Sequence, residues 1–196
     1  MIYCNLSNHR SVTLSAPGLF TGAVTDASGG FADAMEHPIQ TVPVTTADSL
    51  GNDPAHANQG IWLGADDLAG KDSVLVPGLR SCAAVLFYDA GFVLIGAGHA
   101  AGGFINNEIM TQITNTIPSG DVQYIVYATP TLMGETTGSY ADSLGELKKK
   151  WDTRRICFID GFAYPSMGMV IADMTGNIFF PINEQIQELT KAVRQR

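Results

Sequence analysis

The amino-acid sequence predicts an α+β fold, a layered β-sandwich or mixed sheet flanked by helices. Two observations lead to this class. Pairs of short apolar runs, each pair joined by a turn, are typical of β-hairpins. Amphipathic segments with apolar residues at intervals of three and four lie between other strands, which is typical of helices covering a sheet. The sequence contains neither the regular βαβ alternation nor the glycine fingerprint of a dinucleotide fold, and it has no P-loop.

The elements follow a mixed order. Residues 1–72 alternate β-like pieces with long polar loops, and we expect them to form an irregular β-rich extension packed on a main domain of residues 73–196. Within the main domain, the predicted strands are 81–89, 92–99, 121–128, 154–162 and the two arms of a hairpin, 167–181, that turns at Thr175-Gly176. The predicted helices are 104–117, 140–151 and 182–196.

Composition limits the classes of partner. The chain has 196 residues and a formal net charge of -8, and only Arg10 is basic among its first seventy residues. Such a balance argues against nucleic acid, because phosphate binding depends on clustered Lys and Arg. No apolar run is long enough to span a membrane, so we expect a soluble protein, either cytoplasmic or secreted or injected into a host cell.

The three cysteines, Cys4, Cys82 and Cys157, lack the spacing of a zinc site, and no metal or organic cofactor is expected. Cys82 stands at the start of the strand 81–89, and His99 ends the strand 92–99. In an antiparallel pair these two positions meet at one edge of the sheet. A thiol beside an imidazole is the nucleophile-and-base arrangement of cysteine hydrolases, in which a thiolate–imidazolium pair forms. The alternative is ordinary: a free Cys usually acts as a small buried hydrophobe, and a His at a strand end is usually structural.

The residues around Cys82 read GLRSCAAVLFYD, and the following strand ends in GAGH. This pattern resembles the CheD family of chemoreceptor glutamine deamidases, whose hallmark is a strand beginning GLGSCVAVxxYD followed by a strand that ends in His. The resemblance covers about residues 73–180, and extends, through the same Cys-His site on a β-sandwich flanked by helices, to the deamidase domains of cytotoxic necrotizing factors and a Burkholderia lethal factor.

The resemblance implies that Cys82 is the nucleophile and His99 the base, with backbone N–H groups near Ser81 and Cys82 stabilising an oxyanion. Two positions depart from the family. Arg80 replaces a Gly beside the nucleophile, and Val76 stands where the family has a Thr that orients the His. A backbone carbonyl, of Val76 or of a loop residue, is then expected to hold the imidazole in one tautomer.

The resulting hypothesis is a protein-glutamine deamidase, and the resemblance to the toxins implies a toxin or effector that acts on a partner protein. Two alternatives remain. One is another Cys-His activity on the same scaffold, a transglutaminase or a protease. The other is a binding module that has kept the fold without the chemistry.

Overall fold

In the computed structural model, the described residues are 60–130, 137–152 (side chains from Tyr140 onward), 156–162 and 168–180, together with the backbone of four strands before residue 60. They form an α+β fold of two sheets and three helices, as the sequence predicts. The predicted C-terminal helix, 182–196, lies outside the described residues.

The first sheet is mixed, with the strand order β1-β10-β9-β7-β8-β5. Its strands are β1 (Ile2–Asn5), β10 (Ile156–Asp160), β9 (Tyr124–Ala128), β7 (Ala83–Tyr88), β8 (Leu94–Ala100) and β5 (Gly60–Leu63). The pairs β1–β10 and β10–β9 are parallel, whereas β9–β7, β7–β8 and β8–β5 are antiparallel. The predicted hairpin around Cys82 and His99 is therefore confirmed as the pair β7–β8.

The second sheet has the order β3-β2-β12-β11-β6-β4. Its strands are β3 (Leu19–Thr21), β2 (Ser11–Ser15), β12 (Asn177–Phe179), β11 (Gly168–Asp173), β6 (Ser73–Leu79) and β4 (Ile39–Thr41). All pairs are antiparallel except β4–β6. The predicted hairpin at Thr175-Gly176 is confirmed as β11–β12, with Gly176 at a φ of 90° in the turn.

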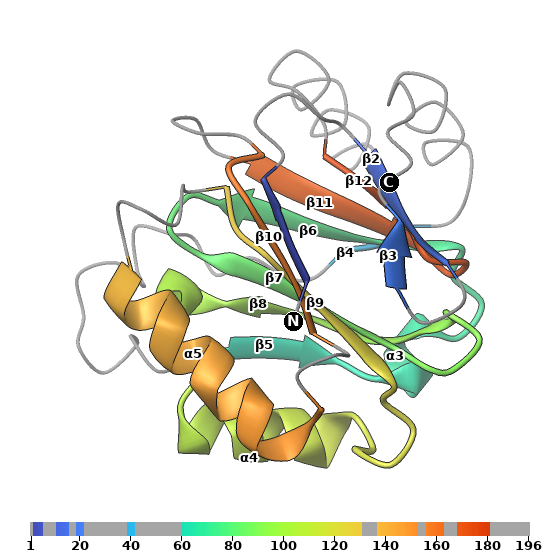
Figure 1. Cartoon of the computed structure of the whole chain (residues 1–196). Helices are drawn as coiled ribbons and strands as arrows, with labels where there is room; N and C mark the ends of the chain where they lie inside the picture. Colours follow the sequence, from blue (N-terminus) through green and yellow to red (C-terminus); the bar gives the residue numbers. More distant parts are fainter. Residues whose placement is uncertain are drawn as a thin grey trace.

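The two sheets pack face to face, and helices cover the other face of the first sheet (Figure 1). One apolar cluster lies between the sheets, with Leu86 and Val126 from the first and Val74 and Val170 from the second. A second cluster lies between the first sheet and the helices α4 (Asn107–Thr116) and α5 (Thr137–Lys150). A short helix, α3 (Ala65–Leu68), follows β5. The described residues thus form three layers: sheet, sheet and helices.

Local chemistry explains where α4 begins and which face it buries. The Asn106 side chain accepts a hydrogen bond of 2.9 Å from the Ile109 N–H, which caps the helix. Ile109 and Ile113 are fully buried against the sheet, and Pro118 lies two residues beyond Thr116, the last residue of the helix. The sheet has glycines where the helical layer approaches it, because a Cβ at Gly96 would collide with Ile117. The predicted helices 104–117 and 140–151 are confirmed as α4 (Asn107–Thr116) and α5 (Thr137–Lys150).

Two features were absent from the expected order of elements. The strand β6, interrupted by Pro77-Gly78, was missed, as was α3. Strands from the first 72 residues are built into both sheets: β1 and β5 form the two edges of the first, and β2, β3 and β4 belong to the second.

Candidate functional site

The register of β7 and β8 brings Cys82 and His99 to one face and one end of the hairpin. Ala83 pairs with Ala100, and Ala84 pairs with His99. Cys82 precedes this ladder by one residue, so it lies diagonally across from His99. Because alternate residues share a face, Cys82, Ala84 and His99 all face the second sheet, where Cys82 packs on the cluster between the sheets. Diagonal neighbours of this kind have Cβ atoms about 7 Å apart.

His99 is buried, with 4% of its surface exposed. Its Nε2 atom has no hydrogen-bond partner among the described residues. Hydrogen bonding to the backbone at Gly78 and at His99 itself favours the charged ring, whereas Nε2 is buried and unpaired. Burial lowers the pKa of His99 below its ordinary value of 6.5, and these backbone hydrogen bonds oppose the shift only in part.

The backbone of Gly78 reaches His99 because β6 carries a bulge. Val76 pairs with Val170 and Leu79 pairs with Gly168, so two residues of β6 stand opposite one residue of β11. Gly78 lies in this bulge with a φ of 69°, a conformation that favours glycine. Val76, the residue named from the sequence as holding the imidazole, is fully buried in the core between the sheets. The backbone contact to His99 thus lies at Gly78, two residues further along the strand.

Cys82 is half-buried and has a free thiol. Its Sγ accepts a hydrogen bond of 3.4 Å from the N–H of Gly102, the middle residue of a 3-10 turn, η1 (Ala101–Gly103), that directly follows β8. Burial raises the pKa of the Cys82 thiol above its ordinary value of 9.0, and hydrogen bonds from the Gly102 and Arg80 backbones and the Ser81 hydroxyl partly oppose the rise. The net shift of the pKa is upward.

These two shifts have opposite signs and the same consequence. A raised thiol pKa and a lowered imidazole pKa both favour the neutral forms. Both directions favour a neutral thiol beside a neutral imidazole, whereas the thiolate–imidazolium pair expected from the sequence stays a prediction. No hydrogen bond joins Cys82 to His99 Nε2 in this arrangement.

A buried polar network lies on the helix side of the same sheet edge. The Tyr140 hydroxyl of α5 donates to the Ser81 carbonyl at 2.9 Å and accepts from the Thr129 hydroxyl at 3.2 Å. The Gly103 carbonyl accepts two bonds, from the Tyr127 hydroxyl at 2.6 Å and from Ser143 Oγ at 2.7 Å. Ser143 Oγ also accepts from the Ile105 N–H at 2.8 Å. The residues flanking Cys82 and Gly102 are thereby tied to α5 and β9.

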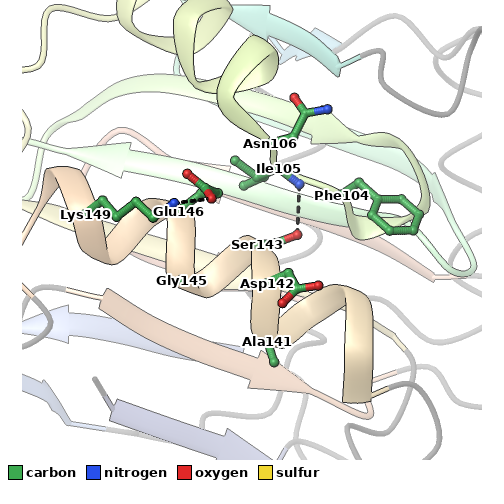
Figure 2. Close-up of a pocket in the computed structure, with 9 residues that line it drawn as sticks. All are labelled: Phe104, Ile105, Asn106, Ala141, Asp142, Ser143, Gly145, Glu146 and Lys149. Atoms are coloured by element: carbon green, nitrogen blue, oxygen red, sulfur yellow. Dashed lines mark hydrogen bonds and ion pairs between the residues drawn. The ribbon is translucent and has the colours of Figure 1, made fainter.

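The two residues expected beside the nucleophile, Arg80 and Ser81, are exposed. Both contribute hydrogen bonds that lower the Cys82 pKa, Arg80 through its backbone and Ser81 through its hydroxyl. An open groove of about 500 Å³ lies further along, between α5 and residues 104–106 (Figure 2). The Ser143–Ile105 hydrogen bond crosses from one wall to the other, and the half-exposed Phe104 ring lies at one end. Neither Cys82 nor His99 lines this groove.

Sequence reasoning missed several residues of this region: Gly78, Gly102, Gly103, Thr129, Tyr127, Tyr140 and Ser143. One signal was present for the glycines. Two consecutive glycines follow Ala101 after His99, and Gly103 has a φ of 74°, where a Cβ would collide with Tyr140. The hydroxyl network had no local signal, because it joins residues up to 59 positions apart.

Among the described residues, no group of three or more His, Cys, Asp or Glu side chains is placed to hold a metal ion. No helix within the same ranges is long and apolar enough to cross a membrane. The chain matches no model of a known protein family, and no curated protein matches it. The likeness to the CheD family therefore depends on the residues quoted above.

Proposed function

We propose that this protein is a cysteine-dependent amidohydrolase that converts a glutamine side chain of a partner protein to glutamate. The observation that carries the proposal is the β7–β8 register, which puts Cys82 and His99 on one face at one end of the hairpin. Two further features support it: the buried, unpaired Nε2 atom of His99 and the N–H of Gly102 beside the sulfur. A two-sheet core with helices on one face is also the arrangement that the resemblance to CheD and the deamidase toxins implies.

The reaction begins from the neutral pair. His99 Nε2 accepts the thiol proton as the Cys82 sulfur attacks the carboxamide carbon, which forms a C–S bond and a tetrahedral oxyanion. The imidazolium returns that proton to the amide nitrogen, the C–N bond breaks, and ammonia leaves. Water, deprotonated by His99, then attacks the thioester carbonyl. The C–S bond breaks, the sulfur regains a proton, and the product is a carboxylate.

A neutral resting pair is compatible with this sequence of steps. General-base catalysis needs an unprotonated imidazole, and the lowered pKa of His99 keeps the ring in that form at neutral pH. The thiol proton moves to His99 while the sulfur attacks the substrate and not before. Cys82 therefore loses its proton only after the bound substrate has displaced water from the site. The donors around the sulfur, including the Gly102 N–H and the N–H groups near Ser81 and Cys82, are the groups that we assign to oxyanion stabilisation.

The experiment compares the masses of candidate glutamine-containing proteins before and after incubation with the protein. Deamidation replaces an amide NH₂ by OH and releases ammonia, and both changes are measurable on the same sample. Cys82→Ser and His99→Ala should each abolish the change, and the two losses should not add, because the residues act as a unit. Cys157→Ala is the matched control, since Cys157 is buried in β10 away from the hairpin end and its loss should leave the activity intact.

The same measurement separates the alternatives. A joined amine would indicate a transglutaminase, and a cleaved backbone a protease. The binding-module alternative is favoured by the partial burial of the Cys82 thiol, which raises its pKa, because a protonated thiol is a weak nucleophile. If Cys82→Ser and His99→Ala bind a partner as wild type does and no mass change occurs with wild type, the binding module replaces the deamidase.

A further inference from the structure

The buried network at the sheet edge joins three separate segments to one helix. Tyr140 and Ser143 lie one helical turn apart on α5 and are almost completely buried. Tyr140 donates to the carbonyl of Ser81, immediately before the nucleophile, and Ser143 donates to the carbonyl of Gly103, immediately after the amide that contacts the sulfur. The two accepting carbonyls, of Ser81 and Gly103, therefore lie on either side of the Cys82–Gly102 contact.

We propose that Tyr140 and Ser143 are positioning residues that hold the Ser81–Cys82 segment and the Ala101–Gly103 turn together, so that the Gly102 N–H donates to the Cys82 sulfur. Neither side chain reaches the sulfur itself; each acts through the backbone next to the reacting group. The inference rests on the proposed function for its catalytic consequence, whereas its effect on Cys82 is measurable in the protein alone.

The conformation of the turn shows why these two positioning residues, called the Tyr140–Ser143 clamp below, are needed. Gly102 and Gly103 have φ values of 59° and 74°, and glycine is the residue with the most conformational freedom to lose. Two hydroxyls, of Tyr127 and Ser143, converge on the Gly103 carbonyl, and Ser143 also accepts from the Ile105 N–H, so the turn is held at both sides (Figure 2 shows the Ser143–Ile105 bond). The helix α5, anchored by its own apolar face, gives the Tyr140 and Ser143 hydroxyls a rigid origin, and the Tyr127 hydroxyl comes from β9.

The clamp matters because the sulfur–amide contact is weak by itself. A thiol sulfur is a weak hydrogen-bond acceptor, and the 3.4 Å contact with the Gly102 N–H lowers the Cys82 pKa against the upward effect of burial. If the turn moves freely, the sulfur loses this donor for part of the time. Thiolate formation then becomes harder, and the same amide is less well placed for an oxyanion.

The first test is amide hydrogen exchange at Gly102, whose N–H is bonded to neither Tyr140 nor Ser143. In Ser143→Ala and in Tyr140→Phe, exchange at Gly102 should accelerate about tenfold, the change expected when one ordinary hydrogen bond no longer restrains the segment. Tyr124→Phe on β9 is the matched control, because Tyr124 stacks on Phe92 at the opposite end of the strand from Tyr127. That control should exchange at Gly102 as wild type does.

The second test is the alkylation rate of Cys82 by iodoacetamide at pH 8, below the raised pKa, where the rate follows the thiolate fraction. Each clamp variant should slow alkylation about three- to tenfold, equivalent to a pKa rise of about 0.5 to 1 unit. Unchanged exchange at Gly102 together with unchanged alkylation, in variants whose thermal midpoints show that they are folded, would overturn the inference. If Tyr140→Phe does not fold, Ser143→Ala alone decides.

Neither test requires a substrate, so the outcomes separate from those of the proposed function. Slower alkylation without any deamidase activity in wild type would leave the clamp standing and remove the proposed reaction. Deamidase activity that stays at the wild-type rate in both Ser143→Ala and Tyr140→Phe would leave the proposed reaction standing and remove the clamp.

Discussion

At the scale of single residues, the candidate site is governed by the burial of two titratable groups of opposite type. His99 is buried in its neutral form, and its pKa is lower in the folded protein than the ordinary 6.5. The unfolded chain therefore binds the additional proton first as the pH falls. The contribution of His99 to stability is fully present above pH 6.5 and is lost as the pH falls from there through the lower folded pKa.

This linkage predicts that wild type loses stability on acidification more steeply than His99→Gln. The difference between the two thermal midpoints should be constant above about pH 7 and should shrink or reverse between pH 6.5 and 5. The other histidines and the carboxylates are common to both proteins and cancel in the comparison. Parallel curves over the whole range would mean that His99 titrates normally and is not buried as described.

Cys82 gives the corresponding prediction on the alkaline side. Because burial raises its pKa, the midpoint of iodoacetamide alkylation should lie above the ordinary 9.0 in the free protein. Cys82 should still react before Cys157, because Cys157 is buried whereas Cys82 is only half-buried. Peptide mapping of the alkylated chain across a pH series measures both. A midpoint near neutrality would instead show that a thiolate–imidazolium pair forms in solution, as the sequence alone predicts.

At the scale of elements, the turn after β8 has no room for added bulk. A Cβ at Gly103 would collide with the Tyr140 ring, and its φ of 74° is unfavourable for any other residue. Gly103→Ala should therefore lower the free energy of unfolding by about 2 to 4 kcal/mol. Urea unfolding measures the change.

Gly145→Ala is the matched control for this substitution. Gly145 lies inside α5 with no atom near its Cβ position, so Ala should stabilise the helix by up to about 1 kcal/mol. If both glycines respond alike, the close approach of Tyr140 to the turn is not present in solution, and the clamp proposed above loses its geometric basis.

The elements that sequence reasoning predicted are those with strong local patterns. The β7–β8 and β11–β12 hairpins were predicted because short apolar runs flank turn residues, and α4 because its isoleucines recur every four positions. β6 was missed because Pro77-Gly78 interrupts the apolar run, and those residues form the bulge that brings the Gly78 backbone to His99. Cys82 and His99 followed from chain order, whereas their hydrogen-bond partners follow from contacts between distant segments.

At the scale of the whole molecule, the first part of the chain contributes strands to both sheets. β1 pairs with β10 in parallel and forms one edge of the first sheet. The opposite edge is β5, which pairs with β8 of the hairpin that follows Cys82. β2 lies between β3 and β12 in the second sheet. Such long-range pairings have no signature in a local sequence pattern, because the partners are separated by more than 150 residues. They make the early strands structural parts of the sandwich.

The last prediction compares one substitution at two positions of these early strands. Val12 lies in β2 and pairs with Ile178 of β12, and β2 is an interior strand between β12 and β3, so Pro there removes an N–H from an interior strand. Val12→Pro should lower the thermal midpoint by about 5 to 10 °C, the effect of about 2 to 3 kcal/mol in a chain of this size. Ile2→Pro is the matched control, since Ile2 is the first residue of an edge strand, a position that tolerates Pro. A single cooperative transition that shifts only in Val12→Pro would show that β2 folds with the rest. An unchanged main transition in both variants would instead mean that the early strands form a detachable extension, whose removal by limited proteolysis should then leave the β7–β8 hairpin and its Cys82 intact.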